Sequence, residues 1–379
     1  MIYDRRRTIF FSVADVSADA HAARVIEQLR REPQEIRCVG LGGQAMAAAG
    51  CRLLENLTDR SAMLTHAFGQ VGFYYKLLGR VKDYLRRELP DVVVVVDSPA
   101  WNFHVAQAAK KLGIRVLYYI APQLWAWGAW RAKKLRTRTD RVACILPFEQ
   151  KWFRDRGIEA TYVGHPLFDD DRQINPYEPV EESKEGFPTI ALLAGSRRHE
   201  IKHLWRPMQE IAGRIKQKYP QTRFLTAANS EQNEALLRGE MIEALEVDIR
   251  RRSIEAATRH ADLALVASGT ATLEVAAQHC PMIIMYHVPW WQWQLVGRYI
   301  VKTEYLSLVN ILAGRPLAPE FMPFKGRVEK VAATALGLLT DEQRRREMRK
   351  DLRELIEPIM QPGTATRVAQ IIMDMLPQY

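Results

Sequence analysis

The sequence has few cysteines, no paired metal-ligand motif and no long apolar run. Its four cysteines are scattered over 379 residues without a C-x-x-C pair, which argues against a disulfide framework or a structural zinc site. No stretch approaches the roughly 18 consecutive apolar residues of a membrane span. The apolar stretch after Arg5-Arg6-Arg7 is too short for a signal peptide. We therefore expect a reduced, cytoplasmic protein that contacts membranes only peripherally.

Positive charge, by contrast, is plentiful. The chain has 54 Lys and Arg against 44 Asp and Glu, a formal charge of +10. Such a charge favours anionic partners: nucleotides, phospholipid surfaces, phosphorylated substrates or nucleic acid. With 47% hydrophobic residues and about 150 residues per typical domain, the chain is long enough for two domains.

Short β-branched runs alternate with longer helical patterns from Thr8 onward. This alternation predicts βαβ units and therefore an α/β fold with parallel sheets. Residues 167–188 are acidic and include Pro176 and Pro179 but few apolar side chains, which is typical of an interdomain linker. The predicted domains are 1–166 and 189–345, followed by charged helices over 346–379.

One apolar run ends abruptly at an acid. Val92 to Val96 are five consecutive valines, a pattern that predicts a strand covered on both faces. Ser98 and Pro99 then predict an N-cap and a first-turn proline for the next helix. Ligands of open α/β sheets bind beyond such strand ends. Asp97 is thus either a catalytic base or an acid that caps this helix.

Two strand-to-helix loops in the second half have the composition of anion sites. Gly195-Ser196-Arg197 combines a glycine turn, a hydroxyl and an arginine, and Ser268-Gly269-Thr270 combines a glycine with two hydroxyls. Backbone amides at a helix start bind phosphates, and Glu274, one turn later, could accept hydrogen bonds from a ribose diol. The alternative is a capped helix with Arg197 facing solvent.

An aromatic segment precedes a basic one. Trp125, Trp127 and Trp130 are followed by Arg131 and several further Lys and Arg residues. Indole rings and basic side chains suit an anionic membrane interface, although single-stranded nucleic acid uses the same residue types. A packed tryptophan cluster beside a solvated helix is the third interpretation. The apolar stretch over 62–78 is either a lipid-facing helix or an ordinary core helix.

Seven motifs, taken in this order, resemble lipid-A-disaccharide synthase. They are Asp97-x-Pro-x-x-Asn102, Ala121-Pro-Gln-x-Trp-Ala-Trp127, Pro147-Phe-Glu149, Val163-Gly-His-Pro-Leu167, Gly195-Ser-Arg197, Ser268-Gly-Thr-Ala-Thr-Leu-Glu274 and Ser307-Leu-x-Asn-Ile-Leu-Ala-Gly-Arg315. The resemblance implies a GT-B type α/β fold, in which two Rossmann-like doubly wound domains face a cleft. The first domain takes the acceptor and the second the UDP-sugar, and the C-terminal helices return toward the first domain.

The resemblance also implies an activity: inverting transfer of 2,3-diacylglucosamine from UDP to the 6-hydroxyl of 2,3-diacylglucosamine 1-phosphate, without a metal or other cofactor. Both substrates are acylated, so the expected location is the cytoplasmic face of the inner membrane, bound peripherally to its anionic surface. A homodimer is compatible with this assignment. No nucleic-acid partner is expected, because the basic segment is local and carries no recognised RNA or DNA motif.

Residue chemistry assigns roles within this reaction. Asp97 is the expected base, Arg197 with the Ser268 to Thr270 amides the diphosphate clamp, and Asn310 a hydrogen-bond donor to sugar or phosphate. Trp125, Trp127, Trp130 and Arg131 are the membrane or acyl candidates. The expected substrate-binding residues are Ser17, Asp19, Asn102, Gln123, Gly195, Ser196, Ser268, Gly269, Thr270, Glu274 and Glu320.

The chain departs from the family pattern after its first strand. Ala14 and Ala18 stand where the family has glycines, and a Cβ disfavours backbone with positive φ. Two rival functions stay open, the first because it uses the same paired α/β domains and strand-end phosphate loops, and the second because of these lost glycines. One is a UDP-N-acetylglucosamine 2-epimerase or another UDP-sugar glycosyltransferase. The other is a non-catalytic UDP-sugar-binding paralogue at the membrane.

Overall fold

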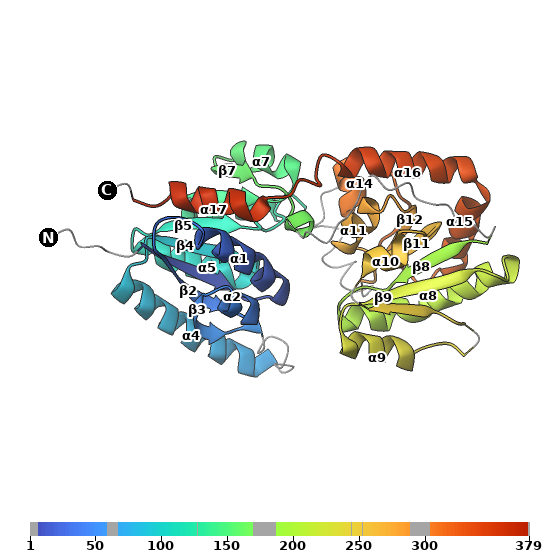
Figure 1. Ribbon diagram of the computed structural model, residues 1–379, viewed down its shortest axis with the longest axis horizontal. Coiled ribbons are helices and arrows are strands. Elements are labelled where there is room, and N and C mark those ends of the chain that lie inside the picture. The colour runs from blue at the N-terminus through green and yellow to red at the C-terminus, as the bar shows by residue number, and fades with distance from the viewer. Residues whose placement is uncertain are drawn as a thin grey trace. The chain divides into compact units, whose positions relative to one another are not determined.

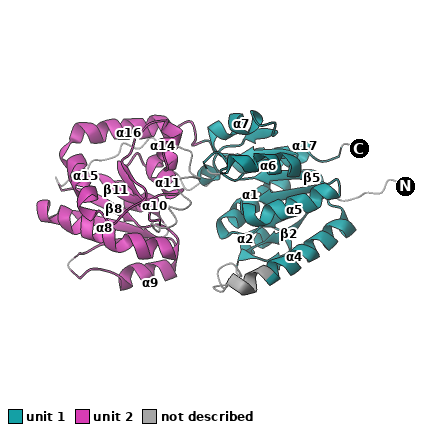
Figure 2. Cartoon of the chain, turned by 180° about the vertical axis from the view of Figure 1, so that it is seen from behind, with its two compact units in different colours: residues 1–170, 361–379 teal, residues 171–360 magenta. Residues whose placement is uncertain are grey.

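The computed structural model forms two compact α/β units (Figures 1 and 2). It describes residues 7–58, 67–126, 128–169, 187–243, 245–251, 253–288 and 304–377. Unit 1 comprises residues 1–170 and 361–379, and unit 2 comprises residues 171–360. The chain thus passes from unit 1 to unit 2 within the linker predicted over 167–188, of which residues 170–186 lie outside the described residues.

Unit 1 is a seven-stranded parallel sheet with the order β3-β2-β1-β4-β5-β6-β7. The strands are β1 (Arg7–Val13), β2 (Ile36–Gly42), β3 (Arg52–Asn56), β4 (Val92–Val96), β5 (Arg115–Tyr119), β6 (Arg141–Cys144) and β7 (Ala160–Tyr162). The helical segments are α1 (Val16–Leu29), α2 (Gln44–Ala48), α4 (Ala67–Glu88), α5 (Pro99–Lys111), η1 (Ala129–Arg131), α6 (Ala132–Arg138), α7 (Pro147–Arg154), η2 (Pro166–Asp169) and α17 (Thr364–Asp374).

The valine strand β4 is covered on both faces, as its sequence predicts. All five valines are fully buried. Val92, Val94 and Val96 contact the core beneath α1 and α17, whereas Val93 and Val95 face the core beneath α4 and α5. The alternation follows from the two-residue period of a strand. The predicted Ser98 cap is wrong, because Ser98 has a left-handed backbone (φ 42°) and its side chain makes no capping hydrogen bond.

The last helix, α17, belongs to unit 1 although it follows unit 2 in the chain. It packs against α1, and its first amides, from Thr364 and Ala365, donate to the Asp169 carboxylate at 2.7 and 2.8 Å. This carboxylate stabilises the positive end of the helix. Of the helices predicted to return to the first domain, α16 (Glu342–Ile356) instead packs within unit 2, on α11 and α15.

Unit 2 is a six-stranded parallel sheet with the order β10-β9-β8-β11-β12-β13. The strands are β8 (Thr189–Leu193), β9 (Arg223–Ala228), β10 (Asp248–Arg251), β11 (Leu263–Ala267), β12 (Met282–Met285) and β13 (Glu320–Phe321). The remaining helices of the unit are α8 (Arg198–Lys218), α9 (Glu231–Gly239), α10 (Ile254–Thr258), α11 (Ala271–Ala277), α14 (Leu308–Ala313) and α15 (Val328–Thr340).

Both sheets reverse their winding direction once. In unit 1 the reversal lies between β1 and β4, and in unit 2 it lies between β8 and β11. Connections on the two sides of such a point leave in opposite directions, so a crevice opens at the carboxyl ends of these strands, where ligands of open α/β sheets bind. The topology therefore singles out four loops: those after β1 and β4, and those after β8 and β11.

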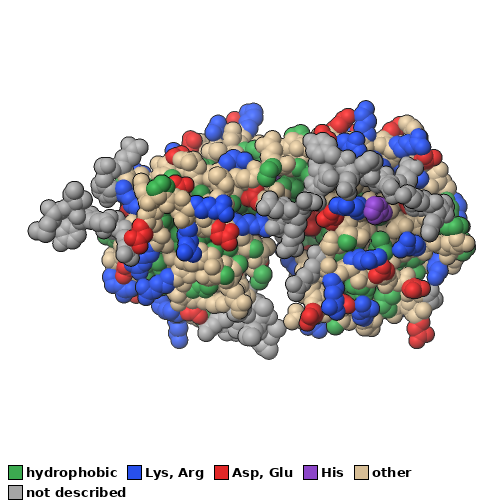
Figure 3. All heavy atoms as spheres, viewed as in Figure 1, with side chains coloured by type: hydrophobic (Ala, Val, Ile, Leu, Met, Phe, Trp, Pro, Cys, Tyr) green, Lys and Arg blue, Asp and Glu red, His purple; other side chains and the backbone are tan. Residues whose placement is uncertain are grey.

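The surface of the described residues mixes basic and acidic side chains over both units, as Figure 3 shows for one face. Within the described part of the chain, no helix is long and apolar enough to cross a bilayer. The apolar helix expected over 62–78 falls partly outside the described residues, since α4 begins at Ala67. All four cysteines are buried and free.

Candidate functional site

Asp97 occupies a strained turn at the switch point of unit 1. Asp97 and Ser98 follow β4 with φ angles of 47° and 42°. The left-handed region costs a non-glycine residue about 1–3 kcal/mol, and such a conformation persists only where the surroundings impose it. Two such residues in succession therefore require a firm local support.

The support is a buried polar network built from three elements. The Asn102 side-chain amide on α5 donates to the carbonyls of Val96 and Asp97, each at 2.8 Å. Its oxygen accepts from the Ser12 hydroxyl of β1 at 2.8 Å, and the Trp101 indole donates to the same hydroxyl at 3.0 Å. Asn102 is fully buried, so its hydrogen bonds fix the Asp97 turn to α5 and to the neighbouring strand.

Tyr118 of β5 adds a further hydrogen bond to this turn. Its hydroxyl donates to the Asp97 carbonyl at 2.7 Å. Burial, reinforced by the charge of Asp97, raises the pKa of Tyr118 well above its usual range, so the hydroxyl stays protonated and remains a donor. Sequence reasoning missed Ser12 and Tyr118, since each lies inside an ordinary strand pattern.

Replacing Asn102 with alanine tests this network. We expect a loss of about 3 kcal/mol in the free energy of unfolding, because the substitution removes three buried hydrogen bonds and leaves the Ser12 hydroxyl without its acceptor. The midpoint of chemical denaturation measures the change. His104, which is exposed on the same helix, provides the control, and H104A should leave the midpoint nearly unchanged. Equal midpoints for N102A and H104A would contradict the network.

The altered loop after β1 is accommodated without strain. Neither Ala14 nor Ala18 has a positive φ; Ala18 lies within α1 and is buried. The missing glycines are thus not required for this backbone. Ser17 is exposed in the first turn of α1, where its hydroxyl is accessible at the switch point.

Asp19 points away from that surface and is buried. Its carboxylate accepts from the backbone amides of Gly43 at 2.6 Å, Ala45 at 2.9 Å and Met46 at 3.4 Å. The backbone amides of the glycine turn before α2 therefore bind an anionic group, and that group is the chain's own carboxylate.

The loop after β8 is shaped by one acidic residue of α8. The Glu200 carboxylate accepts from the amides of Ser196 and Arg197, both at 3.1 Å, and from the Arg197 guanidinium at 3.2 Å. Gly195 has φ 106°, and a Cβ there would lie 2.4 Å from a Glu200 carboxylate oxygen. Glycine is therefore required. The Arg197 guanidinium is held by its hydrogen bond to Glu200, yet the side chain remains 70% exposed.

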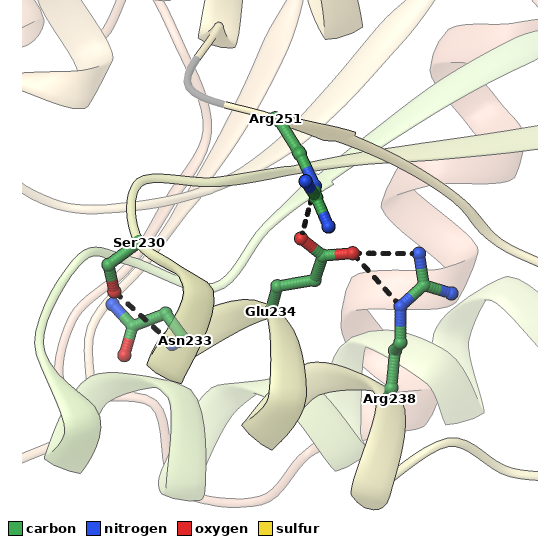
Figure 4. Close-up of polar contacts among 5 residues, drawn as sticks. All are labelled: Ser230, Asn233, Glu234, Arg238 and Arg251. Atoms are coloured by element: carbon green, nitrogen blue, oxygen red, sulfur yellow. Dashed lines mark hydrogen bonds and ion pairs between the residues drawn. The ribbon is translucent and has the colours of Figure 1, made fainter.

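Helix α9 also contacts this loop, and Figure 4 shows the polar contacts that surround its first turns. The Asn233 amide donates to the Ser196 carbonyl at 2.7 Å, and its backbone N–H donates to the Ser230 hydroxyl that caps α9. One turn after Ser230, the Glu234 carboxylate accepts from Arg238 at 2.9 Å and from Arg251 at 2.8 Å. Hydrogen bonds from these two arginines lower the pKa of Glu234, so the cluster stays charged and links α9 to β10.

The loop after β11 lies at the neighbouring strand end. Ser268 is half-buried, whereas Gly269 and Thr270 are exposed. Gly269 has φ 154°, a backbone conformation that favours glycine. Because β8 and β11 are paired parallel strands, the two predicted anion loops of unit 2 lie side by side. Burial raises the pKa of Glu274, in the first turn of α11, to about 7.

A cavity of about 320 Å³ borders the β8 loop. Its lining includes Glu200, His203 and His287, and the two imidazole rings stack with centroids 4.3 Å apart. Burial, with a smaller contribution from His203, lowers the pKa of His287. At neutral pH His287 is therefore uncharged, so its stacking on His203 brings no repulsion between two imidazolium ions.

Asn310 and Glu320 are brought together in unit 2. The Asn310 amide donates to the Ala318 carbonyl at 2.8 Å and to the Glu320 carboxylate at 3.0 Å, and its oxygen accepts from the Ala318 amide. Glu320 also accepts from the amides of Leu306 and Ser307. Asn310 is fully buried, so its side chain joins α14 to the segment that enters β13.

The aromatic segment divides into buried and exposed members. The half-buried Trp125 donates to the Glu149 carboxylate at 2.9 Å and packs edge-on against Phe148. Trp130 is 74% exposed, with Arg131 beside its ring. Gln123 is exposed, and Trp127 lies outside the described residues. Of these two described tryptophans, Trp130 alone presents its ring to solvent.

A family model matches nearly the whole chain. The model described as lipid-A-disaccharide synthetase matches residues 9–374. Among curated proteins, the chain is 34% identical over 387 residues to "Lipid-A-disaccharide synthase" of Anaeromyxobacter sp. (strain K), covering 99% of this chain and all of that one. It is 32% identical over 390 residues to the protein of the same name from Neisseria meningitidis serogroup C, covering 99% of each.

Solved structures share the architecture at low identity. The UDP co-structure of S. aureus MnaA matches with a TM-score of 0.63 at 11% identity, covering 98% of each chain. MurG of Acinetobacter baumannii matches with a TM-score of 0.57 at 16% identity, covering 97% of this chain and 99% of that one. These likenesses show the two-unit Rossmann-like fold of GT-B glycosyltransferases and UDP-sugar epimerases. The match over residues 9–374 and the full-length relatives place the chain in the lipid-A-disaccharide synthase family.

Proposed function

We propose that the protein is an inverting glycosyltransferase that makes the lipid A disaccharide. It transfers 2,3-diacylglucosamine from UDP to the 6-hydroxyl of 2,3-diacylglucosamine 1-phosphate and releases UDP. The observation that carries the proposal is the Asp97 turn, in which two left-handed residues follow β4 and a buried asparagine holds them in place. A fold keeps such strain where a particular side-chain direction is needed.

The proposed reaction is a single displacement. Asp97 accepts the proton of the acceptor hydroxyl while that oxygen bonds to the anomeric carbon. The bond from this carbon to the diphosphate breaks, and UDP leaves with the electron pair. The exposed guanidinium of Arg197 and the amides of Gly269 and Thr270 stabilise the charge that develops on the diphosphate. Two amides of the Gly195 loop and the Arg197 guanidinium bond to Glu200, so the exposed part of that guanidinium is what this loop offers the diphosphate.

Two further assignments concern binding. Glu274 accepts hydrogen bonds from the ribose hydroxyls, since its carboxyl lies one turn into α11 beside the exposed Gly269 loop. Asn310 is expected to donate to sugar or phosphate. In this structure both of its amide hydrogens bond to Ala318 and Glu320 and the residue is fully buried, so donation to substrate would require these bonds to break, whereas the contacts support a role in positioning Glu320.

The pH dependence of UDP binding tests the Glu274 assignment. With a pKa of about 7, the carboxyl is protonated below that pH and loses acceptor capacity, whereas above it the carboxylate accepts both ribose hydroxyls. UDP affinity should therefore rise several-fold as the pH increases from about 6 to about 8. Calorimetry on the wild type and E274Q measures the difference, since UDP's own titration is common to both. Parallel pH profiles would exclude Glu274 from the ribose site.

The reaction itself is tested with both acylated substrates. Purified protein is incubated with UDP-2,3-diacylglucosamine and the monosaccharide 1-phosphate in detergent, and mass spectrometry follows UDP and the disaccharide. Formation of both products in equal amounts supports the proposal. UDP release without disaccharide would indicate a different acceptor. Absence of any reaction would favour a non-catalytic UDP-sugar-binding paralogue.

The structural likeness to UDP-sugar epimerases supplies the second candidate. A solved UDP-N-acetylglucosamine 2-epimerase from Neisseria meningitidis, bound to UDP-GlcNAc, matches with a TM-score of 0.62 at 12% identity, covering 97% of this chain and 99% of that one. An epimerase needs no acylated acceptor. Incubation with UDP-N-acetylglucosamine alone, followed by NMR of the sugar protons, would reveal a change at carbon 2.

We further propose that the protein works at the cytoplasmic face of the inner membrane and binds it peripherally. Acylated substrates reside in a bilayer, so the enzyme must reach its surface. The exposed Trp130 and the adjacent Arg131 are the described residues that support this location, because indole and guanidinium groups favour the headgroup level.

A further inference from the structure

Helices α5 and α6 are neighbours in unit 1 (Figure 2), and residues of both helices, together with Trp130, line a basic groove. It encloses about 600 Å³. Five of its eight lining residues are cationic and none is acidic; the lining comprises Gln107, Lys110, Lys111, Trp130, Lys133, Lys134, Thr137 and Arg138. We call it the α5–α6 groove. It lies outside the loops at the switch point, so the proposed reaction does not use it.

Most of the positive charge in the groove is uncompensated. Lys110 pairs with Asp140 at 2.6 Å, and the other Asp140 oxygen accepts from the backbone at Val116. Arg138 donates to the Phe103 carbonyl at 3.1 Å. Lys111, Lys133 and Lys134 are exposed, and no acidic side chain among the described residues pairs with them. Cations gathered in this way repel each other, and a bound anion relieves the repulsion.

Trp130, which also lines the groove, indicates that the anion belongs to a lipid headgroup. Its ring is 74% exposed, and the Lys134 ammonium lies 5.6 Å from the ring centroid. An exposed indole beside ammonium groups is stabilised at the headgroup level of a bilayer, where the ring meets the acyl boundary and the cations meet phosphates. A free phosphate ion has no apolar part, so contact with the indole ring would not stabilise it. Single-stranded nucleic acid needs a row of stacking rings, and Trp130 is the one aromatic residue in the lining.

We propose that the α5–α6 groove binds the phosphate of an anionic phospholipid headgroup and so fixes unit 1 to the bilayer. The inference deepens the proposed function and rests on it for its biological setting, since acylated substrates are the reason for a membrane contact. It adds a defined site and a preference for anionic over zwitterionic lipid.

The test measures partition onto vesicles. Wild-type protein should bind vesicles of phosphatidylcholine mixed with phosphatidylglycerol far more tightly than vesicles of phosphatidylcholine alone, and added salt should weaken the binding. The variant K111S/K133S/K134S should lose about a hundredfold in partition, since each lysine near an anionic surface contributes roughly fivefold. W130S alone should weaken binding to both kinds of vesicle.

A matched variant separates the groove from net charge. K216S/K218S/K330S removes the same charge from unit 2 and should keep wild-type partition. An equal loss in both variants would show a general charge effect and overturn the proposal. It would also be overturned if inorganic phosphate at millimolar concentration displaced the protein from vesicles, or if the groove variant lost binding to single-stranded RNA but kept vesicle binding.

Turnover in detergent micelles distinguishes this proposal from the proposed function. If the wild-type protein forms no disaccharide but binds phosphatidylglycerol vesicles through the groove lysines, the enzymatic proposal is overturned and the groove proposal stands. If the wild-type protein forms disaccharide but the groove variant still partitions normally, the enzymatic proposal stands and the groove proposal is overturned.

Discussion

Asp97→Asn is expected to lower the turnover number by about a hundredfold to ten-thousandfold while UDP affinity stays at the wild-type value. The amide has nearly the shape of the carboxylate, so the turn that Asn102 and Tyr118 support should persist. What it loses is the ability to take a proton from the acceptor hydroxyl. Steady-state UDP release and UDP calorimetry measure the two quantities on the same preparation.

The opposite end of the same strand supplies the control. Asp91 precedes β4, and its carboxylate accepts from the Thr8 amide at 2.8 Å. D91N therefore makes the same chemical change at the same strand without touching the switch point, and we expect it to retain turnover with a modest loss of stability. Wild-type turnover in D97N would remove Asp97 from the reaction. Equal losses in D97N and D91N would attribute the effect to folding.

Arg197→Ala is expected to have the second largest effect, a fall in the turnover number of about a hundredfold to a thousandfold. The guanidinium is an exposed cation of the β8 loop, and it donates to the Glu200 carboxylate at 3.2 Å. Removing it leaves the departing diphosphate with backbone amides alone. Stability should change little, because a side chain that is 70% exposed contributes little to folding through its ion pair.

Arg198 provides the matched control for this variant. It is the next residue and is also exposed, at the start of α8, and R198A removes the same charge from nearly the same place. We expect R198A to keep most of the wild-type turnover. If both variants lose turnover equally, the loop acts through general positive potential, and if R197A remains active, the diphosphate clamp lies elsewhere.

The sequence predicts the architecture well because both units follow simple periodic rules. The valine run predicts a strand buried on two faces, and the alternation of strands and helices predicts the parallel sheets. The strand β3 is missed, since Arg52–Asn56 ends in polar residues and all five are at least partly exposed. It is an edge strand of the sheet, and edge strands do not need an apolar pattern.

The candidate site is only partly predictable, because several of its residues act through long-range hydrogen bonds. Asp97 and Arg197 are recognisable as polar residues after apolar strands. The contact between Ser12 and Asn102 joins residues 90 positions apart, and that between Asp19 and Gly43 joins residues 24 positions apart. Glu200 could have been found, since an acid three residues after a helix cap is a capping signal.

The origin of α17 at the end of the chain has a consequence for synthesis. Val368 and Ile372 of α17 cover part of the core that contains Phe11 of β1, yet Thr364 follows Asp169 by 195 positions. At about 5–20 residues per second, the ribosome needs about 10–40 s to make that interval. During this time unit 2 can complete its own sheet, while the apolar patch beneath α17 stays open to water. Unit 1 therefore leaves the ribosome first but is completed last.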